Sequence, residues 1–434
     1  MLKALTIKVH LHSILWLFIA NCVGVLLAVL LLFPELNRPL APFTYGRWMP
    51  LHLNLHLYGW MSIPLLGLLF AWYLEPTKLG TRLGNMLLLI WSAALAFGAL
   101  SWLGGSSSGK LFLDWQDTAK SVFLAALIVW WGTLTVCYGM RLRRRGIAGE
   151  GGVGVVAGKA VLLTLLAAVP PAFTFALRRD VYPPINRLSS GATGASLLVS
   201  TLGILVVFWL LPLILRLPLR RAEAPWLLLA ALVVHFGLWS FIDHGSSSHH
   251  DPMQIVSLAT LIAWVPLLSW YYAQFAWPDS AKRWLLSFGW WGAVLVVTAV
   301  VMFLPGVLER VKFTNGLVAH VHLAMAGMTS SFLMVLLVVL GTPSGLGSVL
   351  SNRTAFVLWH AGLCIYLGSM LYVSSLESHH VDILYRTYAV RAVAYGSRLV
   401  GGVAMCSASL WWLLETLSFQ TRQTRRATAA NGKG

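Results

Sequence analysis

The sequence predicts an all-α polytopic membrane protein. Of its 434 residues, 58% are hydrophobic and only 10% are charged. A soluble globular chain carries roughly 25% charged residues, so this composition excludes a water-soluble enzyme. The apolar residues also lie in blocks of about 20 residues, the length at which a helix crosses the hydrocarbon core of a bilayer. None of these blocks alternates like the strands of a membrane barrel, whereas helices satisfy their own backbone hydrogen bonds in lipid.

Twelve apolar blocks, separated by charged residues or by Gly and Pro, define the expected helices. We expect residues 1–418 to form a single twelve-span domain and the polar residues 419–434 to form a disordered cytoplasmic tail. The first block is too long for a signal peptide and lacks a small-residue cleavage site, so we expect it to remain as an anchor. The blocks cover residues 11–34, 48–74, 83–104, 118–140, 158–177, 194–216, 225–243, 252–277, 284–306, 315–341, 353–375 and 393–416.

The charge distribution predicts how the spans are oriented. The net charge is +17, with 31 Lys and Arg against 14 Asp and Glu. More than half of the basic residues fall in loops on one side, above all in the run RLRRR at 141–145. The other basic residues fall on the opposite side, together with carboxylates that include Asp114, Glu309 and Glu377. The positive-inside rule therefore places both termini in the cytoplasm. Because the basic residues flank apolar spans, we expect membrane lipid and not nucleic acid as their partner.

Histidines from distant spans are expected at one depth of the membrane. An ionisable group inside a span is costly and indicates a functional site. With the N-terminus inside, the second and tenth spans begin at the outer face and the seventh span ends there. This topology brings three pairs of histidines to that face: His52 and His56, His320 and His322, and His249 and His250, with His244 beside the last pair.

The spacing of His320 and His322 limits what this pair can bind. Two residues on a helix differ by about 200° of rotation, so the two rings point to opposite sides of their span. They cannot chelate one metal ion, but each can hold one of two cofactors, and neutral imidazole is a usual axial ligand of haem iron. The alternative is a pair of hydrogen-bonding residues at a helix interface. His235, in the middle of the seventh span, is expected to be an ordinary core histidine.

Three stretches resemble the catalytic subunit of the haem-copper oxidase superfamily, closest to the branch of the cbb-type oxidases and nitric oxide reductases. They are GRWMPLHLN at 46–54, TNGLVAHVH at 314–322, and VHF at 234–236 followed by His249 and His250. The resemblance implies a twelve-helix haem-copper oxidase-like bundle. It also implies two b-type haems, with His52 and His322 on the low-spin haem and His320 on the high-spin haem.

The same resemblance implies a non-haem iron or copper ion held by His249 and His250, opposite the high-spin haem. Arg47, one turn before His52, is a candidate partner for haem propionates, as are Arg310 and Lys312. The alternative for all three cations is an ordinary charge in an outer loop. The resemblance further implies a bacterial inner membrane location and an electron donor. We expect a c-type cytochrome subunit, because this chain has no CxxCH motif of its own.

Departures from the family pattern affect the expected substrate. Residues 191–196 contain no histidine where the family takes a third non-haem metal ligand, and Asp243 stands where oxidases of this branch carry a tyrosine. Reduction of dioxygen to water uses that tyrosine as an electron source, whereas reduction of nitric oxide to nitrous oxide does not need it. Nitric oxide is therefore favoured over dioxygen, with non-haem iron and with Asp243, Asp251 or His244 as a further ligand. The alternative for both aspartates is a capping role in an outer loop.

Two other functions compete with this respiratory oxidoreductase. One is a dihaem membrane protein for electron transfer or gas sensing that has lost the second metal, as the missing histidine in the sixth span indicates. The other is a transporter without cofactors, in which the histidines line a pathway. This last hypothesis leaves the resemblance of three histidine motifs unexplained.

Overall fold

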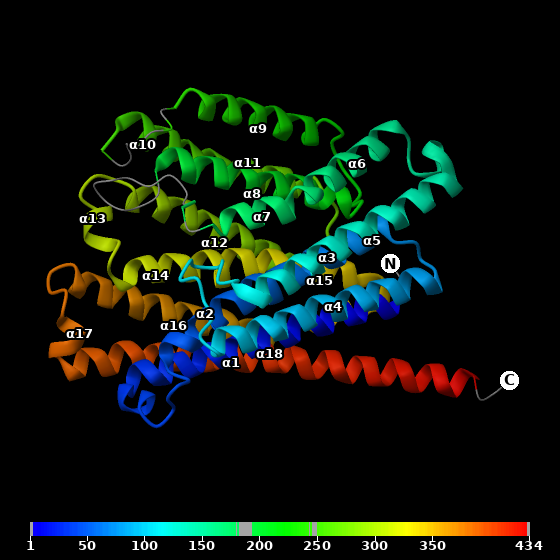
Figure 1. Cartoon of the computed structure of the whole chain (residues 1–434). Helices are drawn as coiled ribbons and strands as arrows, with labels where there is room; N and C mark the ends of the chain where they lie inside the picture. The colour runs from blue at the N-terminus through cyan, green and yellow to red at the C-terminus, as the bar shows by residue number, and fades with distance from the viewer. Residues whose placement is uncertain (1–2, 179, 182–192, 243, 245–249, 432–434) are drawn as a thin grey trace. The chain divides into compact units, whose positions relative to one another are not determined.

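The computed structural model describes residues 3–178, 180, 181, 193–242, 244 and 250–431, and all regular secondary structure in these residues is helical (Figure 1). The predicted all-α class is confirmed for this part of the chain, where an isolated bridge joins Leu219 and Phe275. Eleven helices in the described ranges are long and apolar enough to cross a membrane. The seventh expected block forms a shorter apolar helix, Ala224–Ser240. The chain is therefore a multi-pass membrane protein by length and composition of its helices.

The chain divides into two compact units, where one domain over 1–418 was expected. The first unit comprises Met1–Val181, Leu340–Phe356 and Met405–Gly434, and the second comprises Tyr182–Val339 and Val357–Ala404. The later segments join the first unit through buried polar contacts. Asn21 donates a hydrogen bond of 3.0 Å to the Ser409 hydroxyl, and Asn352 donates one of 3.0 Å to Glu415.

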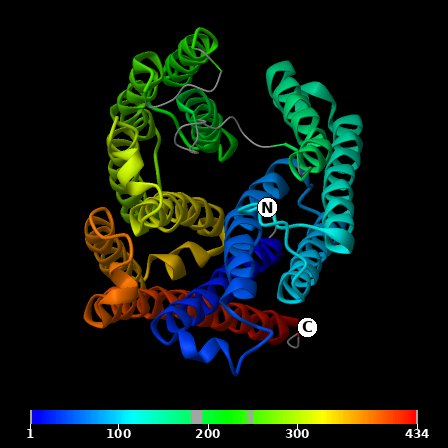
Figure 2. The same ribbon diagram turned by 60° about the vertical axis from the view of Figure 1, so that its left-hand side comes forward.

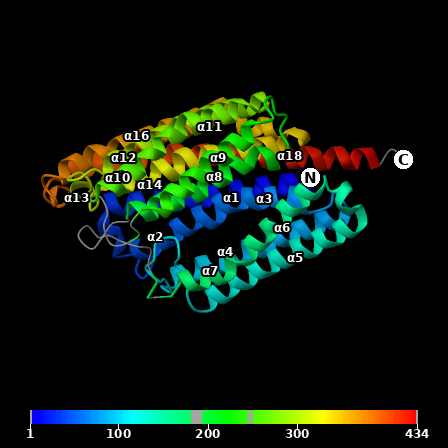
Figure 3. The same cartoon turned by 90° about the horizontal axis from the view of Figure 1, so that it is seen from above.

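The helices of the first unit follow the first five predicted spans. The second span is one continuous helix of three parts, α2, the π-helical segment η2 and α3, and the fifth span is divided into α6 and α7 before Pro170. Helix α4 packs along α5, and α5 also contacts α6 and α7 (Figure 3). The bounds are α1 Lys3–Leu32, α2 Tyr45–Asn54, η2 Leu55–Met61, α3 Ser62–Tyr73, α4 Lys78–Leu103, α5 Asp117–Gly149, α6 Val153–Ala167 and α7 Val169–Ala176.

Aromatic side chains fill the core of the first unit. Trp115 stacks on Phe123 with ring centroids 4.1 Å apart, and Trp102 and Tyr58 meet the same indole edge to face. Trp91 donates a hydrogen bond of 2.8 Å to the Tyr58 carbonyl, which η2 exposes to it. Buried tryptophans need a partner for their indole N–H, and the irregular turns of η2 supply one.

The second unit begins with three helices, of which the first packs on the other two. Helix α8 contacts both α9 and α10, which are drawn in green in Figure 2. Thr193 caps α8 through Ser196, Asp251 caps α10 through Met253, and Thr314 caps α14 through Gly316. The bounds are α8 Gly194–Ile214, α9 Ala224–Ser240, α10 Pro252–Ala259, η3 Thr260–Ala263, α11 Trp264–Ala273, α12 Lys282–Met302, α13 Leu308–Val311, α14 Asn315–His322 and η5 Leu323–Thr329.

The remaining helices carry the chain to its C-terminus. They are α15 Ser330–Gly341, α16 Arg353–Glu377, α17 Ile383–Arg386 and α18 Tyr388–Asn431, and the 3-10 turns η6 and η7 lie within 342–351. Helix α18 continues past residue 418, where a disordered tail was expected. The physical reason is that residues 419–431 contain neither Pro nor Gly, so nothing breaks the helix before Asn431.

Candidate functional site

His52 lies against helix α1, where one of its ring nitrogens forms a hydrogen bond to the backbone. Its Nδ1 is 3.0 Å from the carbonyl oxygen of Ala20. A carbonyl only accepts hydrogen bonds, so Nδ1 carries the proton and Nε2 has the lone pair that ligates metals. The Nε2 atom has no hydrogen-bond partner among the described residues. The ring fits here because Gly24 has no side chain: a Cβ atom at Gly24 would lie 2.7 Å from Cε1 of His52.

Both predicted histidine helices continue into seven residues of π-helix. In the first unit η2 directly follows α2, and His56 within it packs edge to face on His52, with ring centroids 4.7 Å apart. In the second unit η5 directly follows His322. Such π-helical turns are rare and are frequent at functional sites. These segments were not expected from the sequence; each contains one glycine, Gly59 in η2 and Gly327 in η5.

His320 and His322 point to different neighbours, as their spacing predicts. Nδ1 of His320 is 3.3 Å from the Thr298 hydroxyl on α12, whose own proton goes to a backbone carbonyl of its helix. Nδ1 of His322 donates to the carbonyl of Val318 at 2.8 Å, and its ring packs on Tyr366 of α16 at 4.5 Å. In both residues Nδ1 is therefore the donor and Nε2 carries the lone pair. The same protonation pattern as in His52 thus recurs at both positions.

His235 and His360 show the opposite pattern. The indole of Trp264 donates to Nδ1 of His235 at 2.7 Å, and Thr260 contacts Nε2 at 2.6 Å. The indole of Trp291 donates to Nδ1 of His360 at 3.1 Å, and a serine hydroxyl contacts its Nε2. Both nitrogens of each ring are committed to the protein, so neither residue can bind a metal without breaking a hydrogen bond. His235 is a core histidine, as expected.

The expected non-haem metal ligands are described only in part. Asp243 and His249 lie outside the described residues. Nε2 of His250 is 3.1 Å from Glu309 Oε1, with both side chains partly exposed. Glu309 is the sole carboxylate in the connection between the ninth and tenth expected spans, and no sequence pattern pairs it with His250. Among the described residues no group of three or more His, Cys, Asp or Glu side chains could hold a metal ion.

The other candidate ligands near this pair have structural roles. Asp251 accepts a hydrogen bond of 2.9 Å from the Met253 amide, so it caps α10, the alternative that its loop position left open. The ring of His244 lies 4.5 Å from Trp239. At the start of α8, where the family pattern places a third histidine, the fully buried Gln254 accepts a hydrogen bond from the Ala195 amide at 3.3 Å.

Arg47 caps the end of a helix. Its Nη1 donates a hydrogen bond of 2.8 Å to the carbonyl of Leu103, the last residue of α4, and its guanidinium lies against Gly105. A cation at a helix C-terminus is stabilised by the carbonyls that have no partner in the helix. This contact gives Arg47 a structural role that does not depend on a propionate. The Lys312 ammonium lies over the Phe313 ring at 4.6 Å.

A buried polar cluster fixes the helix that carries His320 and His322. The Glu377 carboxylate accepts two hydrogen bonds of 2.7 Å, from the backbone amide and from the side chain of Asn315. Arg398 donates to the side-chain oxygen of Asn315, and its guanidinium lies 5.9 Å from the Tyr366 ring that supports His322. The carboxylate therefore satisfies amide groups at the start of α14. The sequence analysis treated Glu377 only as an outer-side charge.

A second buried carboxylate lies next to the helix that carries His52. Asp114, only 3% exposed, accepts hydrogen bonds from Asn54 at 2.8 Å and from Ser107 at 2.7 Å. The side-chain oxygen of Asn54 is buried without a hydrogen-bond partner in the described part of the chain. Asp114 was expected as a loop charge at the outer face, and it is instead part of the core.

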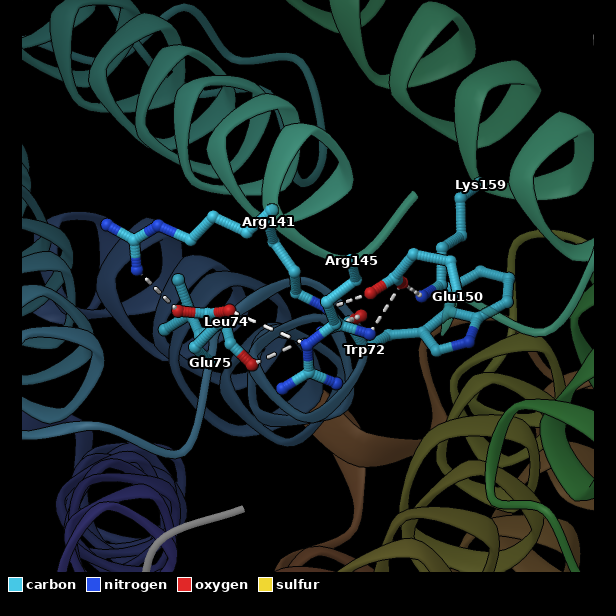
Figure 4. Close-up of polar contacts among 8 residues, drawn as sticks. Trp72, Leu74, Glu75, Arg141, Arg145, Glu150 and Lys159 are labelled. Atoms are coloured by element: carbon cyan, nitrogen blue, oxygen red, sulfur yellow. Dashed lines mark hydrogen bonds and ion pairs between the residues drawn. The ribbon is translucent and has the colours of Figure 1, made fainter. Parts of the chain in front are cut away.

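The first arginine of the run RLRRR at 141–145 belongs to a buried cluster of charged side chains. The side chain of Glu150 is fully buried between Arg141, at 2.5 Å, and Lys159, at 2.8 Å (Figure 4). Arg141 also donates to the carbonyls of Trp72 and Leu74 at the end of α3. Burial alone would raise the pKa of Glu150, but hydrogen bonds and charge from the two cations outweigh it and lower this pKa to about 2.

Comparisons with known proteins do not assign this chain to a family. No protein-family model matches it, and no curated protein matches it either. Its site must therefore be interpreted from its own residues.

Proposed function

We propose that this chain is a haem-copper oxidase-type catalytic subunit of a respiratory complex, built as a twelve-span bundle. It reduces a diatomic gas, with nitric oxide favoured over dioxygen. His52, His320 and His322 are the axial haem ligands, assigned to the low-spin and high-spin b-type haems as the resemblance implies. His249 and His250 hold the non-haem iron or copper, with Asp243 beside them, and a c-type cytochrome subunit delivers the electrons.

The protonation pattern of the histidines carries this proposal. His52, His320 and His322 each donate Nδ1–H to an oxygen atom, which leaves Nε2 as the ligating nitrogen. Haem and zinc proteins hold their histidine ligands in this way, because the outer hydrogen bond fixes the tautomer and the ring orientation. His235, which the family pattern does not use as a ligand, lacks this arrangement, and so does His360. His10 and His379 also place Nδ1 against a carbonyl, at 2.8 and 2.9 Å, but neither lies in one of the three motifs. The residues present thus fit two haems.

The expected reaction balances as two nitric oxide molecules, two electrons and two protons giving one nitrous oxide and one water. The bound haems and the non-haem metal supply electron relay and gas binding. The chain's own residues position the ligands: Gly24 leaves room for the ring of His52, and Glu377 anchors the start of α14. Glu309 is a carboxylate within hydrogen-bond distance of His250, and it can hold a proton or orient that imidazole.

A dihaem protein for electron transfer or gas sensing is the alternative. Two observations favour it: the start of α8 faces Gln254 of α10 and carries no histidine, and His250 is paired with Glu309. In this case the haem ligands are the same and the second metal is absent. Metal analysis separates the two functions, because the enzyme requires about one non-haem iron or copper per chain.

The test is a reduced-minus-oxidised absorption spectrum of the purified full-length chain and three variants. We expect b-type haem bands in the unmodified chain. H52A and H322A should each lose the same low-spin haem, whereas H320A should lose the high-spin haem. The matched control is His235→Gln, which should keep both haems because His235 binds only protein groups. A chain without haem, or equal haem loss in the control, would contradict the proposal.

Consumption of nitric oxide and dioxygen by the intact complex then identifies the gas. We expect nitric oxide to be consumed and H249A to abolish turnover while both haems remain bound. Turnover of dioxygen alone would assign the chain to the oxidase activity instead.

A further inference from the structure

An apolar cavity of about 650 Å³ opens on one side of the second unit. Helices α8, α11 and α12 line it, with Phe208, Trp264 and Val296 among its walls. Leu286 and Trp290 of α12 stand at its rim with 77% and 64% of their surface exposed. A cavity of this size matches a binding site for a small molecule, and its almost wholly apolar walls fit a hydrocarbon chain.

One end of this cavity is closed by an ordered aromatic pair. Tyr272 and Trp277 both line the cavity and stack with ring centroids 5.3 Å apart at 13°. The Tyr272 hydroxyl donates to the carbonyl of Phe208 at 3.0 Å. Trp and Tyr at the level of lipid headgroups mark the boundary between hydrocarbon and water.

Two loops just beyond this aromatic pair are joined to each other and carry unusual positive charge. The amide of Arg220 donates to the Gln274 carbonyl at 2.8 Å, and the amide of Ala276 donates to the Pro218 carbonyl at 2.9 Å. These loops and the start of α12 carry five exposed basic residues, Arg216, Arg220, Arg221, Lys282 and Arg283. The same stretches contain only two carboxylates, Glu223 and Asp279. Arg220 and Arg221 have no polar side-chain partner among the described residues.

The length of the cavity corresponds to one leaflet. Along α12 its lining runs from Leu285 to Val296, which is about 17 Å at the helical rise per residue. The hydrocarbon core of a bilayer is about 30 Å thick, so one acyl layer is about half of that. A chain lying in this cavity would therefore reach roughly the middle of the bilayer, with its headgroup at the basic loops.

We propose that this cavity is a specific binding site for an anionic phospholipid. One acyl chain lies between α8, α11 and α12, and Arg220 and Arg221 bind the headgroup phosphate. The side that carries these loops is the one that the positive-inside rule assigns to the cytoplasm, where anionic lipids are concentrated. The site is independent of the haem ligands and does not rest on the proposed function.

The headgroup half of the site is tested with the delipidated full-length chain. Native mass spectrometry measures binding of added phosphatidylglycerol and of phosphatidylcholine with identical acyl chains. The variant R220Q/R221Q should bind phosphatidylglycerol roughly 25-fold more weakly, from about fivefold for each arginine near the headgroup. Phosphatidylcholine should lose less affinity, because its choline group compensates the charge of its phosphate. The matched control R422Q/R425Q removes two exposed arginines from α18 and should bind like the unmodified chain. If the double variant does not fold, R221Q alone should show about a fivefold loss.

The chain-binding half is tested by filling the cavity. Gly289 lines it, and a Cβ atom there would meet no heavy atom within 4 Å, so Gly289→Phe projects a ring into the cavity. We expect weaker binding of phosphatidylglycerol. The control Gly203→Phe, at an exposed α8 glycine outside the lining, should not change it. Equal binding of both lipids to the unmodified chain, no effect of Gly289→Phe, or recovery of an isoprenoid quinone as the bound molecule would overturn the proposal.

Discussion

The fit between Gly24 and His52 yields the sharpest test of the haem-ligand geometry. In Gly24→Ala the new Cβ would stand 2.7 Å from Cε1 of His52. Carbon atoms in contact prefer about 3.5–4.0 Å, so the imidazole has to retreat by about 1 Å. A metal–ligand bond tolerates about 0.2 Å, so if His52 ligates a haem as proposed, a displacement of this size would break that bond unless α1 moves away from α2.

We expect Gly24→Ala to lower haem affinity by about 10-fold or more, as when a group that orients a metal ligand is removed. The measurement is the ratio of low-spin haem to protein, from the reduced-minus-oxidised spectrum. Gly132→Ala is the matched control, because its Cβ would meet nothing within 4 Å. Alanine should there stabilise the helix by about 0.5–1 kcal/mol and leave haem content unchanged. A Gly24→Ala chain with full low-spin haem and an unshifted spectrum would refute the reasoning.

Two further predictions concern buried carboxylates. Glu150→Gln should lower the free energy of unfolding by about 3–5 kcal/mol, because it leaves two buried cations without a counter-charge. The control Asp180→Asn removes a carboxylate from an exposed ion pair and should leave the stability essentially unchanged. The pKa of Glu150 in the folded state is depressed to about 2, so its contribution to stability is present above about pH 4.5 and is lost as the pH falls towards 2. Thermal unfolding of Glu150→Gln, measured over this range, should lack this pH dependence. Glu377→Gln should lower the free energy of unfolding by about 1–3 kcal/mol, because it removes one of two acceptors for Asn315, and it should also shift the haem spectrum. The control Asp382→Asn, at an exposed ion pair, should change neither the stability nor the spectrum. An unshifted spectrum in Glu377→Gln would show that this cluster does not act on the histidines.

The helices could be predicted from the sequence because their signal is local. All twelve apolar blocks coincide with helices, and only Ala224–Ser240 falls short of spanning length. The division into two units could not be predicted, since it depends on which distant helices pack together. Residues 419–431 differ from the expectation: their polar composition indicated disorder, whereas the absence of Pro and Gly permits α18 to continue.

Charged residues were harder to place than apolar ones. Arg141, Asp114 and Glu377 all appeared to be loop charges, and the structure buries each of them with hydrogen-bond partners. The partner of Arg141 lies nine residues away, so a short-range search for opposite charges would have found Glu150. Asn315 lies 62 residues from Glu377, and no sequence pattern connects them.

The protonation states of His52 and His235 are determined by tertiary structure. His52 and His235 both follow apolar residues inside predicted spans, and nothing in their local sequence fixes a tautomer. A carbonyl 32 residues away makes Nδ1 of His52 a donor, whereas an indole 29 residues away makes Nδ1 of His235 an acceptor. Because a carbonyl can only accept and an indole N–H can only donate, these two partners determine opposite protonation states. Trp264→Phe would remove this donor from His235, and the haem content should stay unchanged in the absorption spectrum, because His235 holds neither haem in the proposed assignment.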